Sequence, residues 1–296
     1  RMKDLKTIRG MPDLYDEEVE RISIVENICL ETFKSFNFQE FRTPIVENKS
    51  LFQRSVGESS DIIQKEVYEF EDRNGELLCL RPEGTAGLVR ALITNGLMND
   101  EIKKFFYLGP MFRYERPQKG RKRQFFQAGA ELIGEESTKS DVEIILLART
   151  ILEKLNVKYT LEINYLGKKD SLNSYRSYLR KYLQNFKDKL SERVYARLQR
   201  NPIRAIDSKD SNIQEIFEKA SDISEFLNKE EKESFERTIK SLKDLKIHFN
   251  LNKNLVRGLD YYTGTVFEFT ADGLGAQNAV IGGGRYDNLI KDLGGR

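Results

Sequence analysis

The segment that most constrains this chain is residues 112–125, where a cationic loop separates two runs that are rich in aromatic residues. Six of the eleven residues at positions 113–123 are cationic, and only Glu115 opposes them. Pro117 and Gly120 exclude regular structure in the middle of the segment, so the pattern predicts a strand, a loop and a strand. A hairpin of this kind suits a polyanion, either the phosphates of a nucleotide or a nucleic-acid backbone.

The residue types in this hairpin favour a binding site over a solvated basic loop. A lysine run alone would favour the solvated loop, but most of these cations are arginines, whose planar guanidinium matches phosphate oxygens. Phe112, Tyr114, Phe125 and Phe126 can offer an aromatic face to a purine.

Hydrophobic periodicity along the chain predicts an α+β fold. Residues 16–36 have apolar side chains at helical spacing, and a short strand at 38–43 follows them. Asn74-Gly75 between two short apolar runs predicts a hairpin. Helices are expected at 85–97, with Thr85 as N-cap, and at 140–155, where Ser140 opens a capping box. Strands are expected at 104–107, 111–116, 123–133, 159–165, 255–259, 262–270 and 278–282. Strands joined by hairpins, with helices to one side, indicate an antiparallel sheet flanked by helices.

The composition of the sequence changes near Gly167. From there to residue 246 the chain is helical in pattern and densely charged, which predicts a helical insertion domain. The remaining parts, 1–166 and 247–296, are expected to form one domain in two pieces. The cations of the insertion are interpreted mostly as a solvated face, with contact to RNA as the alternative.

Composition limits the possible classes of protein. The net charge is only +2, so a nucleic-acid site must be a local patch. No apolar run approaches the length of a membrane span, and Cys29 and Cys79 are too few for a disulfide framework or a zinc site. We therefore expect no metal site, and a reducing, cytoplasmic compartment. His248 is the only histidine, which excludes a histidine-based triad away from that one position, and we expect it to be a strand residue without chemistry.

Four segments resemble one known family. Arg113, Glu115, Arg121 and Phe125 match motif 2 of the class II aminoacyl-tRNA synthetases. The run Arg-Gly-Leu-Asp-Tyr-Tyr-Thr-Gly at 257–264 is similar to the signature of histidyl-tRNA synthetases. Further matches lie at 81–85 and 283–287. The sequence has no Walker loop and no Gly-x-Gly-x-x-Gly between a strand and a helix, which fits a class II mode of holding ATP.

The resemblance implies a reaction in two steps. L-Histidine is activated by ATP, which carries Mg²⁺, and the histidyl group then passes to the acceptor end of tRNA(His). The helix and strand at 16–46 correspond to motif 1, which implies a homodimer. The insertion would approach the acceptor stem. The family pattern continues past residue 296 with motif 3 and an anticodon-binding domain, so we interpret the sequence as a catalytic region truncated before motif 3.

The resemblance also implies residue roles. Arg113 and Arg257 would be the catalytic cations on either side of the α-phosphate. The ATP-binding set is Arg113, Glu115, Arg121, Phe125 and Arg257. The histidine-binding set is Glu83, Gly84, Thr85, Arg113, Gln127, Glu131, Arg257, Tyr261, Tyr262 and Tyr286. The residues expected to touch tRNA are Arg116, Gln118, Lys119 and Lys122.

Some of these roles have support from the residues alone, and some have alternatives. Positions 113, 115, 125, 127 and 131 differ by even numbers, so on regular strands their side chains share a face. Arg257 is expected in a buried strand, where it must face an anion or pair with an acid such as Asp260. Gly282–Gly284 suits either a backbone that approaches a ligand or a closely packed strand. Glu83-Gly84-Thr85 is also a plausible helix start, and Tyr286 a plausible core-edge residue.

Two other functions remain open from the sequence. A synthetase-like paralogue could bind histidine or tRNA as a regulatory module without catalysis. A class II synthetase for another amino acid is the second, and the run at 257–264 argues against it.

Overall fold

The computed structural model describes residues 5–58, 60–274 and 278–295. Its helices occupy the following spans: α1 Glu17–Ser35, α2 Lys49–Val56, α3 Thr85–Thr94, α4 Thr138–Lys154, α5 Lys169–Gln184, α6 Glu192–Arg200, α7 Ser211–Phe217, α8 Lys229–Asp244 and α9 Leu289–Asp292. Short helices of other types lie at Ile62–Glu66, Lys187–Lys189, Pro202–Ala205 and Ile223–Phe226. Within these described ranges, no helix has the length and apolar character needed to cross a bilayer.

The strands form three sheets, and most neighbours in them are antiparallel. The first sheet has the order β1-β5-β6, the second β10-β9-β7-β8 and the third β2-β4-β3. Their bounds are β1 Gln39–Glu40, β2 Val46–Asn48, β3 Glu69–Glu71, β4 Leu77–Leu80, β5 Lys103–Phe112, β6 Gln124–Ile133, β7 Thr160–Tyr165, β8 Asn250–Leu251, β9 Thr263–Thr270 and β10 Ala279–Arg285. Among the strands that the structure describes, the pairs β1–β5 and β7–β8 are the parallel ones. The predicted α+β class is confirmed.

The central hairpin of the chain is β5–β6, which contains the cationic loop. The two strands pair from Lys103 with Ile133 to Phe112 with Gln124, and the backbone N–H of Arg113 continues the ladder to Arg123. The expected strands at 104–107 and 111–116 are therefore one strand, which ends at Phe112. Pro110 lies inside it without breaking it. The N–H of Phe112, two residues further on, points away from β6 and donates to the carbonyl of Arg81, so the nitrogen of Pro110 also points away from β6 and its missing N–H removes no hydrogen bond between β5 and β6.

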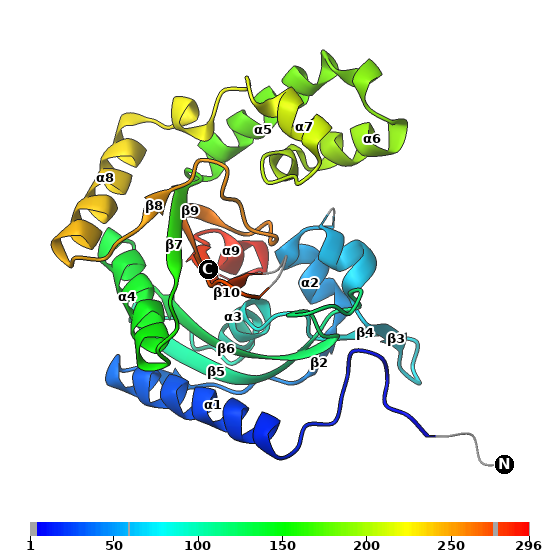
Figure 1. Ribbon diagram of the computed structural model, residues 1–296, viewed down its shortest axis with the longest axis vertical. Helices are drawn as coiled ribbons and strands as arrows, with labels where there is room; N and C mark the ends of the chain where they lie inside the picture. Colours follow the sequence, from blue (N-terminus) through cyan, green and yellow to red (C-terminus); the bar gives the residue numbers. More distant parts are fainter. Residues whose placement is uncertain (1–4, 59, 275–277, 296) are drawn as a thin grey trace.

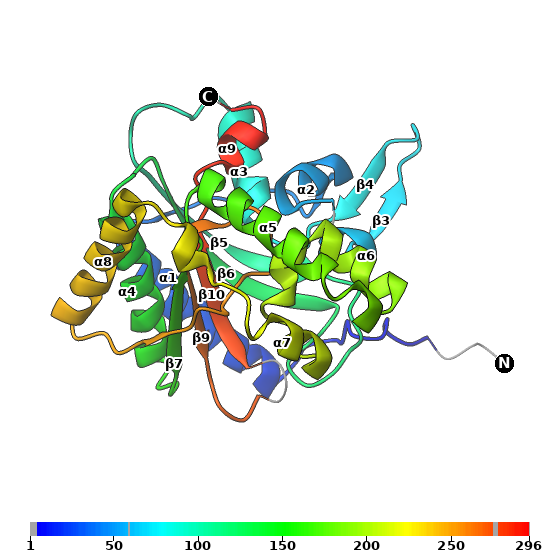
Figure 2. The same cartoon turned by 90° about the horizontal axis from the view of Figure 1, so that it is seen from above.

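Helices cover the sheets on different sides (Figure 1). α1 lies along β5 and β6, and the ring of Phe33 stacks on Phe106 of β5 at 4.9 Å. α4 packs between α1 and α8. The group α5–α7 lies at the far side of the second sheet from α1 (Figure 1), and in the view from above these helices lie in front of the sheets (Figure 2).

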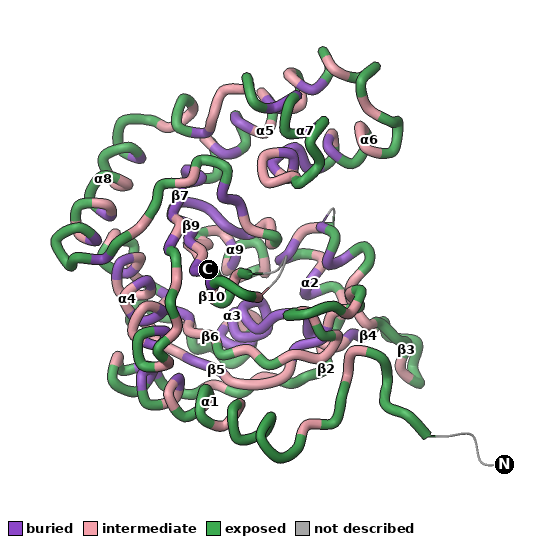
Figure 3. Tube along the Cα trace, in the orientation of Figure 1, coloured by how far each residue is buried: buried purple, intermediate pink, exposed green. Residues whose placement is uncertain are grey.

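The charged segment at 167–246 folds as helices, as the sequence predicted. One face of α5 buries Leu172, Tyr175, Leu179 and Leu183, a helical spacing, in the same cluster as Leu198 of α6. α8 instead packs on α4, where its Leu242 joins a different apolar cluster. Figure 3 shows that the outer surfaces of these helices are largely exposed. The boundaries of an insertion domain stay a prediction.

Four local predictions are wrong. Residues 255–259 form no strand, because β8 ends at Leu251 and the chain is irregular from there to β9. α4 begins at Thr138, so Ser140 lies inside its first turn and donates to the carbonyl of Ser137 instead of capping. Gly84, and not Thr85, is the N-cap of α3. His248 is exposed and lies outside the strands.

Candidate active site

A large cleft lies between the β5–β6 hairpin, the start of α3 and the β9–β10 pair. It is lined by all of the residues that the sequence proposed for ATP and histidine. These are Glu83, Gly84, Thr85, Arg113, Glu115, Arg121, Phe125, Gln127, Glu131, Arg257, Tyr261, Tyr262 and Tyr286. The fold therefore gathers side chains that are up to about 200 positions apart in the sequence, because β6, α3 and β10 converge on the cleft.

Glu131 is the centre of a buried polar network in this cleft. One carboxylate oxygen accepts hydrogen bonds from the hydroxyls of Thr85 at 2.7 Å and Tyr107 at 3.1 Å. The other accepts from the hydroxyl of Tyr286 at 2.6 Å. Burial raises the pKa of Glu131 to about 7, although the three donors oppose the shift. This carboxyl group can therefore change protonation state near neutral pH.

Tyr107 is a functional candidate that sequence reasoning missed. It faces Gly129 in the β5–β6 register, and a methyl group at either Gly84 or Gly129 would overlap its ring. Both glycines thus leave room for the ring, which places its hydroxyl on Glu131. A tyrosine opposite a strand glycine is the signal that could have identified it, but only once the register was known.

Glu83 connects the helix start to the site. Its carboxylate accepts from the backbone N–H groups of Thr85 at 2.8 Å and Ala86 at 2.9 Å, and from the Tyr261 hydroxyl at 3.1 Å. Burial raises the pKa of Glu83, and these donors oppose the rise. The structure shows the helix-start role directly, since this side chain satisfies two free N–H groups at the beginning of α3.

Arg113 makes direct contacts in the cleft with two neutral groups. Its Nε donates to the carbonyl oxygen of Pro82 at 2.9 Å, and its guanidinium lies 5.1 Å from the ring centre of Phe125. Oε2 of Glu115 lies 3.7 Å from Nε of Arg121, so these two residues proposed to bind ATP form an ion pair with each other. Gln127 is on the same strand face as Phe125 and Glu131, as the even spacing predicted.

The cationic loop is a closed hairpin tip. Gln118 and Arg121 exchange backbone hydrogen bonds, and Gly120 has a φ of 78°, in the left-handed region that glycine allows. Arg116, Gln118, Lys119 and Lys122 are exposed, and Lys119 donates to the carbonyl of Gly273 at 2.9 Å. Of the four, Lys122 also lines the cleft. These positions leave the loop open to a large ligand.

The environment of Arg257 differs from the expected one. It lies in the irregular segment after β8, and its Nη1 pairs with Glu268 of β9 at 2.6 Å. The alternative pairing with Asp260 is wrong: Asp260 accepts from the side-chain amide of Asn201 at 3.2 Å. Sequence reasoning missed Glu268. The alternation of polar and apolar residues along a strand does not show which other segment of the chain a polar side chain contacts.

The three consecutive glycines of β10 each make room for a side chain. A methyl group at Gly282 would overlap the Arg257 guanidinium, one at Gly283 the Phe267 ring, and one at Gly284 would crowd Tyr262. This is the closely packed strand that the sequence left as an alternative. Approach of a ligand to this backbone stays a prediction.

Three tyrosines complete the wall of the cleft. The ring centres of Tyr261 and Tyr262 are 4.8 Å apart, and those of Tyr261 and Tyr286 are 5.8 Å apart.

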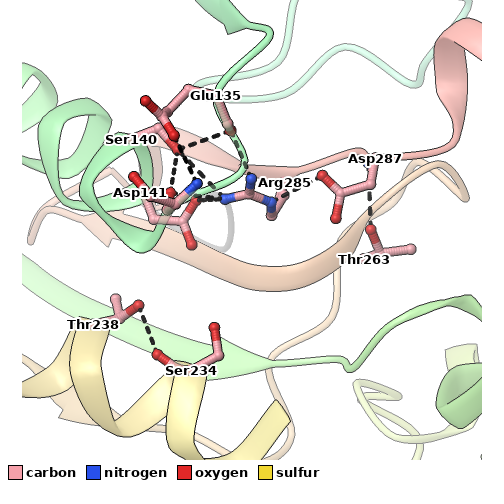
Figure 4. A network of polar contacts seen from close by, with 9 residues as sticks. Glu135, Ser140, Asp141, Ser234, Thr238, Thr263, Arg285 and Asp287 are labelled. Atoms are coloured by element: carbon pink, nitrogen blue, oxygen red, sulfur yellow. Dashed lines mark hydrogen bonds and ion pairs between the residues drawn. The ribbon is translucent and has the colours of Figure 1, made fainter. Parts of the chain in front are cut away.

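Arg285, the neighbour of Tyr286, forms two ion pairs (Figure 4). Its Nη1 lies 2.7 Å from Oδ1 of Asp141, and its Nε lies 2.9 Å from Oδ1 of Asp287. This ion-pair network anchors the end of β10 to the start of α4, and so fixes the backbone from which Tyr286 reaches Glu131.

Metal ligands are not grouped in the described part of the chain. No set of three or more His, Cys, Asp or Glu residues is placed there to hold an ion. Cys29 and Cys79 are buried thiols, and burial raises their pKa values to about 11 and about 12.

A class II aminoacyl-tRNA synthetase is the class of protein that this fold and site define. Comparison with solved structures gives the same class. The apo histidyl-tRNA synthetase of S. aureus superposes with a TM-score of 0.79 at 33% identity, covering 99% of this chain and 69% of that one. A Bacillus halodurans structure described as an ATP phosphoribosyltransferase regulatory subunit/histidyl-tRNA synthetase shares the fold, with a TM-score of 0.70 at 21% identity.

The chain belongs to the histidyl-tRNA synthetase family, whose family model matches residues 10–296. The histidine–tRNA ligase of Prochlorococcus marinus (strain NATL1A) is 45% identical over 295 residues, which are 99% of this chain and 70% of that protein. The histidine–tRNA ligase of Dictyoglomus turgidum is 45% identical over 289 residues, 97% of this chain and 70% of that protein. The chain thus spans about 70% of the length of these relatives.

Proposed function

We propose that this chain carries the catalytic site of a histidine–tRNA ligase, which activates L-histidine with ATP and transfers it to tRNA(His). The observation that supports this most is the buried Glu131 network in a cleft that also contains Arg113 and Arg257. A neutral imidazole has one donor and one acceptor nitrogen. A carboxylate and a phenol can pair with both, and Glu131 and Tyr262 supply them.

The ammonium and carboxylate of histidine need different partners. Glu83 and the Thr85 hydroxyl can accept from the ammonium group, and both lie at the start of α3 beside Glu131. Gln127, Tyr261 and Tyr286 complete the binding site on its other sides. The histidine carboxylate is then directed toward the two arginines, where the α-phosphate of ATP would lie.

In the first step a carboxylate oxygen of histidine attacks the α-phosphorus, and the bond to the bridging oxygen of pyrophosphate breaks. Negative charge grows on the α-phosphate between two anions that repel each other. Arg113 and Arg257 would neutralise it from fixed positions. Phe125 and Glu115 would hold the adenine, and Arg121 would reach the γ-phosphate after leaving Glu115. Mg²⁺ would arrive with ATP on its outer phosphates.

In the second step a ribose hydroxyl of the tRNA end attacks the carbonyl carbon of histidyl-adenylate, and AMP leaves. The exposed loop with Arg116, Gln118, Lys119 and Lys122 would hold the acceptor end, since phosphate contacts position a nucleic acid and Gln118 can read a base. The helices of the 167–246 insertion would approach the same acceptor stem.

Exchange of labelled pyrophosphate into ATP, measured on the full-length protein, tests this function with each amino acid in turn. We expect exchange with histidine alone, and rejection of other amino acids by about 10⁴-fold or more, because their side chains would leave buried polar groups unpaired. Equal exchange with threonine or proline would contradict the assignment. Histidine binding without any exchange would favour the regulatory module instead.

A further inference from the structure

We propose that Glu268 is the positioning residue that fixes the Arg257 guanidinium for adenylate formation. The inference rests on the proposed function, because it assigns Arg257 to the α-phosphate. It goes further in naming the acidic group on which the geometry of Arg257 depends. Three features of the structure carry it: the ion pair itself, the strand register around it, and the lack of other support for Arg257 among the described residues.

The ion pair is short and partly buried. Nη1 of Arg257 lies 2.6 Å from Oε2 of Glu268, and the two side chains are 21% and 22% exposed. Charge-assisted hydrogen bonds of this length are strong, and partial burial reduces their screening by water. The ion pair can therefore hold the long and flexible side chain of Arg257 in one conformation.

The strand register places the carboxylate and the room for the guanidinium together. Glu268 of β9 is paired with Gly282 of β10, and it is at Gly282 that an added methyl group would overlap Cζ, Nη1 and Nη2 of Arg257. Since paired residues on adjacent strands lie side by side, the guanidinium rests on the bare backbone of one strand and pairs with the acid of the other. Figure 2 shows the two strands next to each other.

Little else in the described part of the chain holds Arg257 in place. Its backbone belongs to the irregular segment between β8 and β9, and its Nε is buried with no hydrogen-bond partner there. Two acids that lie near Glu268 are engaged elsewhere. Glu162, paired with Glu268 in the register, accepts from Asn252 at 3.0 Å, and Asp207 pairs with Arg204 at 3.0 Å.

A positioning role predicts a specific split of kinetic constants. Glu268→Gln keeps the shape but removes a negative charge from the region of the ATP phosphates. The KM for ATP should stay level or fall, because one repulsion is removed. The kcat of pyrophosphate exchange should fall by about 10- to 100-fold, because a displaced guanidinium no longer meets the growing charge. Glu268→Asp should recover part of this decrease.

The test compares Glu268→Gln, Glu268→Asp, Arg257→Ala and the double variant in the full-length protein, with Glu162→Gln as the matched control on the neighbouring strand. We expect Glu162→Gln to exchange as the unchanged protein does. In the Arg257→Ala background, Glu268→Gln should have almost no further effect, because the group through which it acts is gone. Melting temperatures of all variants separate unfolding from the kinetic effect.

Distinct outcomes overturn the inference and the proposed function. If Arg257→Ala is inactive while Glu268→Gln exchanges normally, Glu268 does not position Arg257. The same holds if Glu268→Gln lowers kcat equally with and without Arg257, or raises the KM for ATP with kcat unchanged. If folded Arg257→Ala keeps full exchange, it is the assignment of Arg257 in the proposed function that fails.

Discussion

At the scale of single residues, the site contains a buried ionisable group, Glu131, that makes the stability of the fold depend on pH. Glu131 has two oxygens that accept three hydroxyl hydrogen bonds, yet burial still raises its pKa from 4.5 to about 7. A carboxyl group with a raised pKa in the folded state stabilises the fold most when it is protonated, below the unfolded value. That contribution disappears as the pH rises through about 7.

Glu131→Gln should therefore change how stability depends on pH. The amide does not ionise, so the stability of the variant relative to the unchanged protein should increase as the pH rises. Between pH ~5.5 and ~8.5 the difference in unfolding free energy should shift by about 2 kcal/mol in favour of glutamine. Urea unfolding of both proteins at the two pH values measures it. Two stability profiles that stay parallel would show that Glu131 ionises in the fold as it does in water.

Gly282→Ala should damage activity more than stability. The added methyl group would overlap the end of the Arg257 side chain, which can move aside at small cost to the fold. Its displacement should lower the kcat of pyrophosphate exchange by roughly 10- to 100-fold, with only a small shift in melting temperature.

Gly87→Ala is the control for this substitution. A methyl group at Gly87, inside α3, would meet the Thr43 hydroxyl at an ordinary 3.4 Å. It should leave exchange intact and stabilise the fold by about 0.5–1 kcal/mol. Normal exchange by Gly282→Ala would mean that Arg257 does not need its observed position.

At the scale of elements, the start of α8 is joined to the start of α5 by one buried side chain. Glu231 is fully buried and completes a capping box with Asn228. It also accepts from the backbone N–H of Lys168 at 2.6 Å and from the Ser171 hydroxyl at 2.7 Å. One carboxylate thus satisfies donors on two helices that pack on different apolar clusters.

Glu231→Ala should destabilise the protein by about 2–4 kcal/mol, because it leaves several buried donors without a partner. The adjacent Glu230 is exposed and pairs with Lys168 in solvent, so Glu230→Ala should cost less than about 0.5 kcal/mol. Thermal and urea unfolding of the two variants gives the comparison. Equal destabilisation by both would show that the buried network is not the source of the stability.

The loop between β5 and β6 carries a prediction about tRNA. Replacing Lys119 and Lys122 with alanine should weaken charging of tRNA and reduce the salt slope of binding by about 1 for each phosphate that is no longer neutralised. Adenylate formation should change little, because Arg121 is left in place. Lys154→Ala with Lys158→Ala removes the same charge at the end of α4 as a control. Unchanged charging at low and high salt would make the loop a solvated hairpin.

The sequence was most informative where a pattern depends on neighbours along the chain. Motif 2 as a hairpin, α1, the Asn74-Gly75 hairpin and the shared face of Phe125, Gln127 and Glu131 all follow from local spacing. The errors come from tertiary contacts. Residues 255–259 have strand-like composition but no strand partner. The hydroxyl of Ser140 donates to the carbonyl of Ser137, and α4 starts two residues before Ser140, at Thr138. Tyr107 and Glu268 could not be found, because both depend on a register between strands that the sequence does not state.

At the scale of the whole molecule, the N-terminal elements have apolar side chains that this chain leaves uncovered. The second half of α1 packs on β5 through Cys29 and Phe33. In its first half, Val19, Ile24 and Val25 are 41%, 57% and 42% exposed. Ile45 and Val46, just before and within β2, are 42% and 41% exposed. This surface, residues 16–46, is the one for which the resemblance to motif 1 implies a homodimer.

We expect the protein to sediment as a dimer through this surface, and Ile24→Glu combined with Ile45→Glu to make it a monomer. A stable interface of this kind buries about 800 Å² or more on each partner, and two carboxylates placed within it would have to lose their water without a cation to pair with. Leu251→Glu, at an apolar residue of β8 that is 62% exposed, is the control and should stay dimeric. Sedimentation velocity at several concentrations distinguishes the states. If the unchanged chain is monomeric throughout, or if the double variant still dimerises, the apolar surface of α1 and β2 serves another purpose.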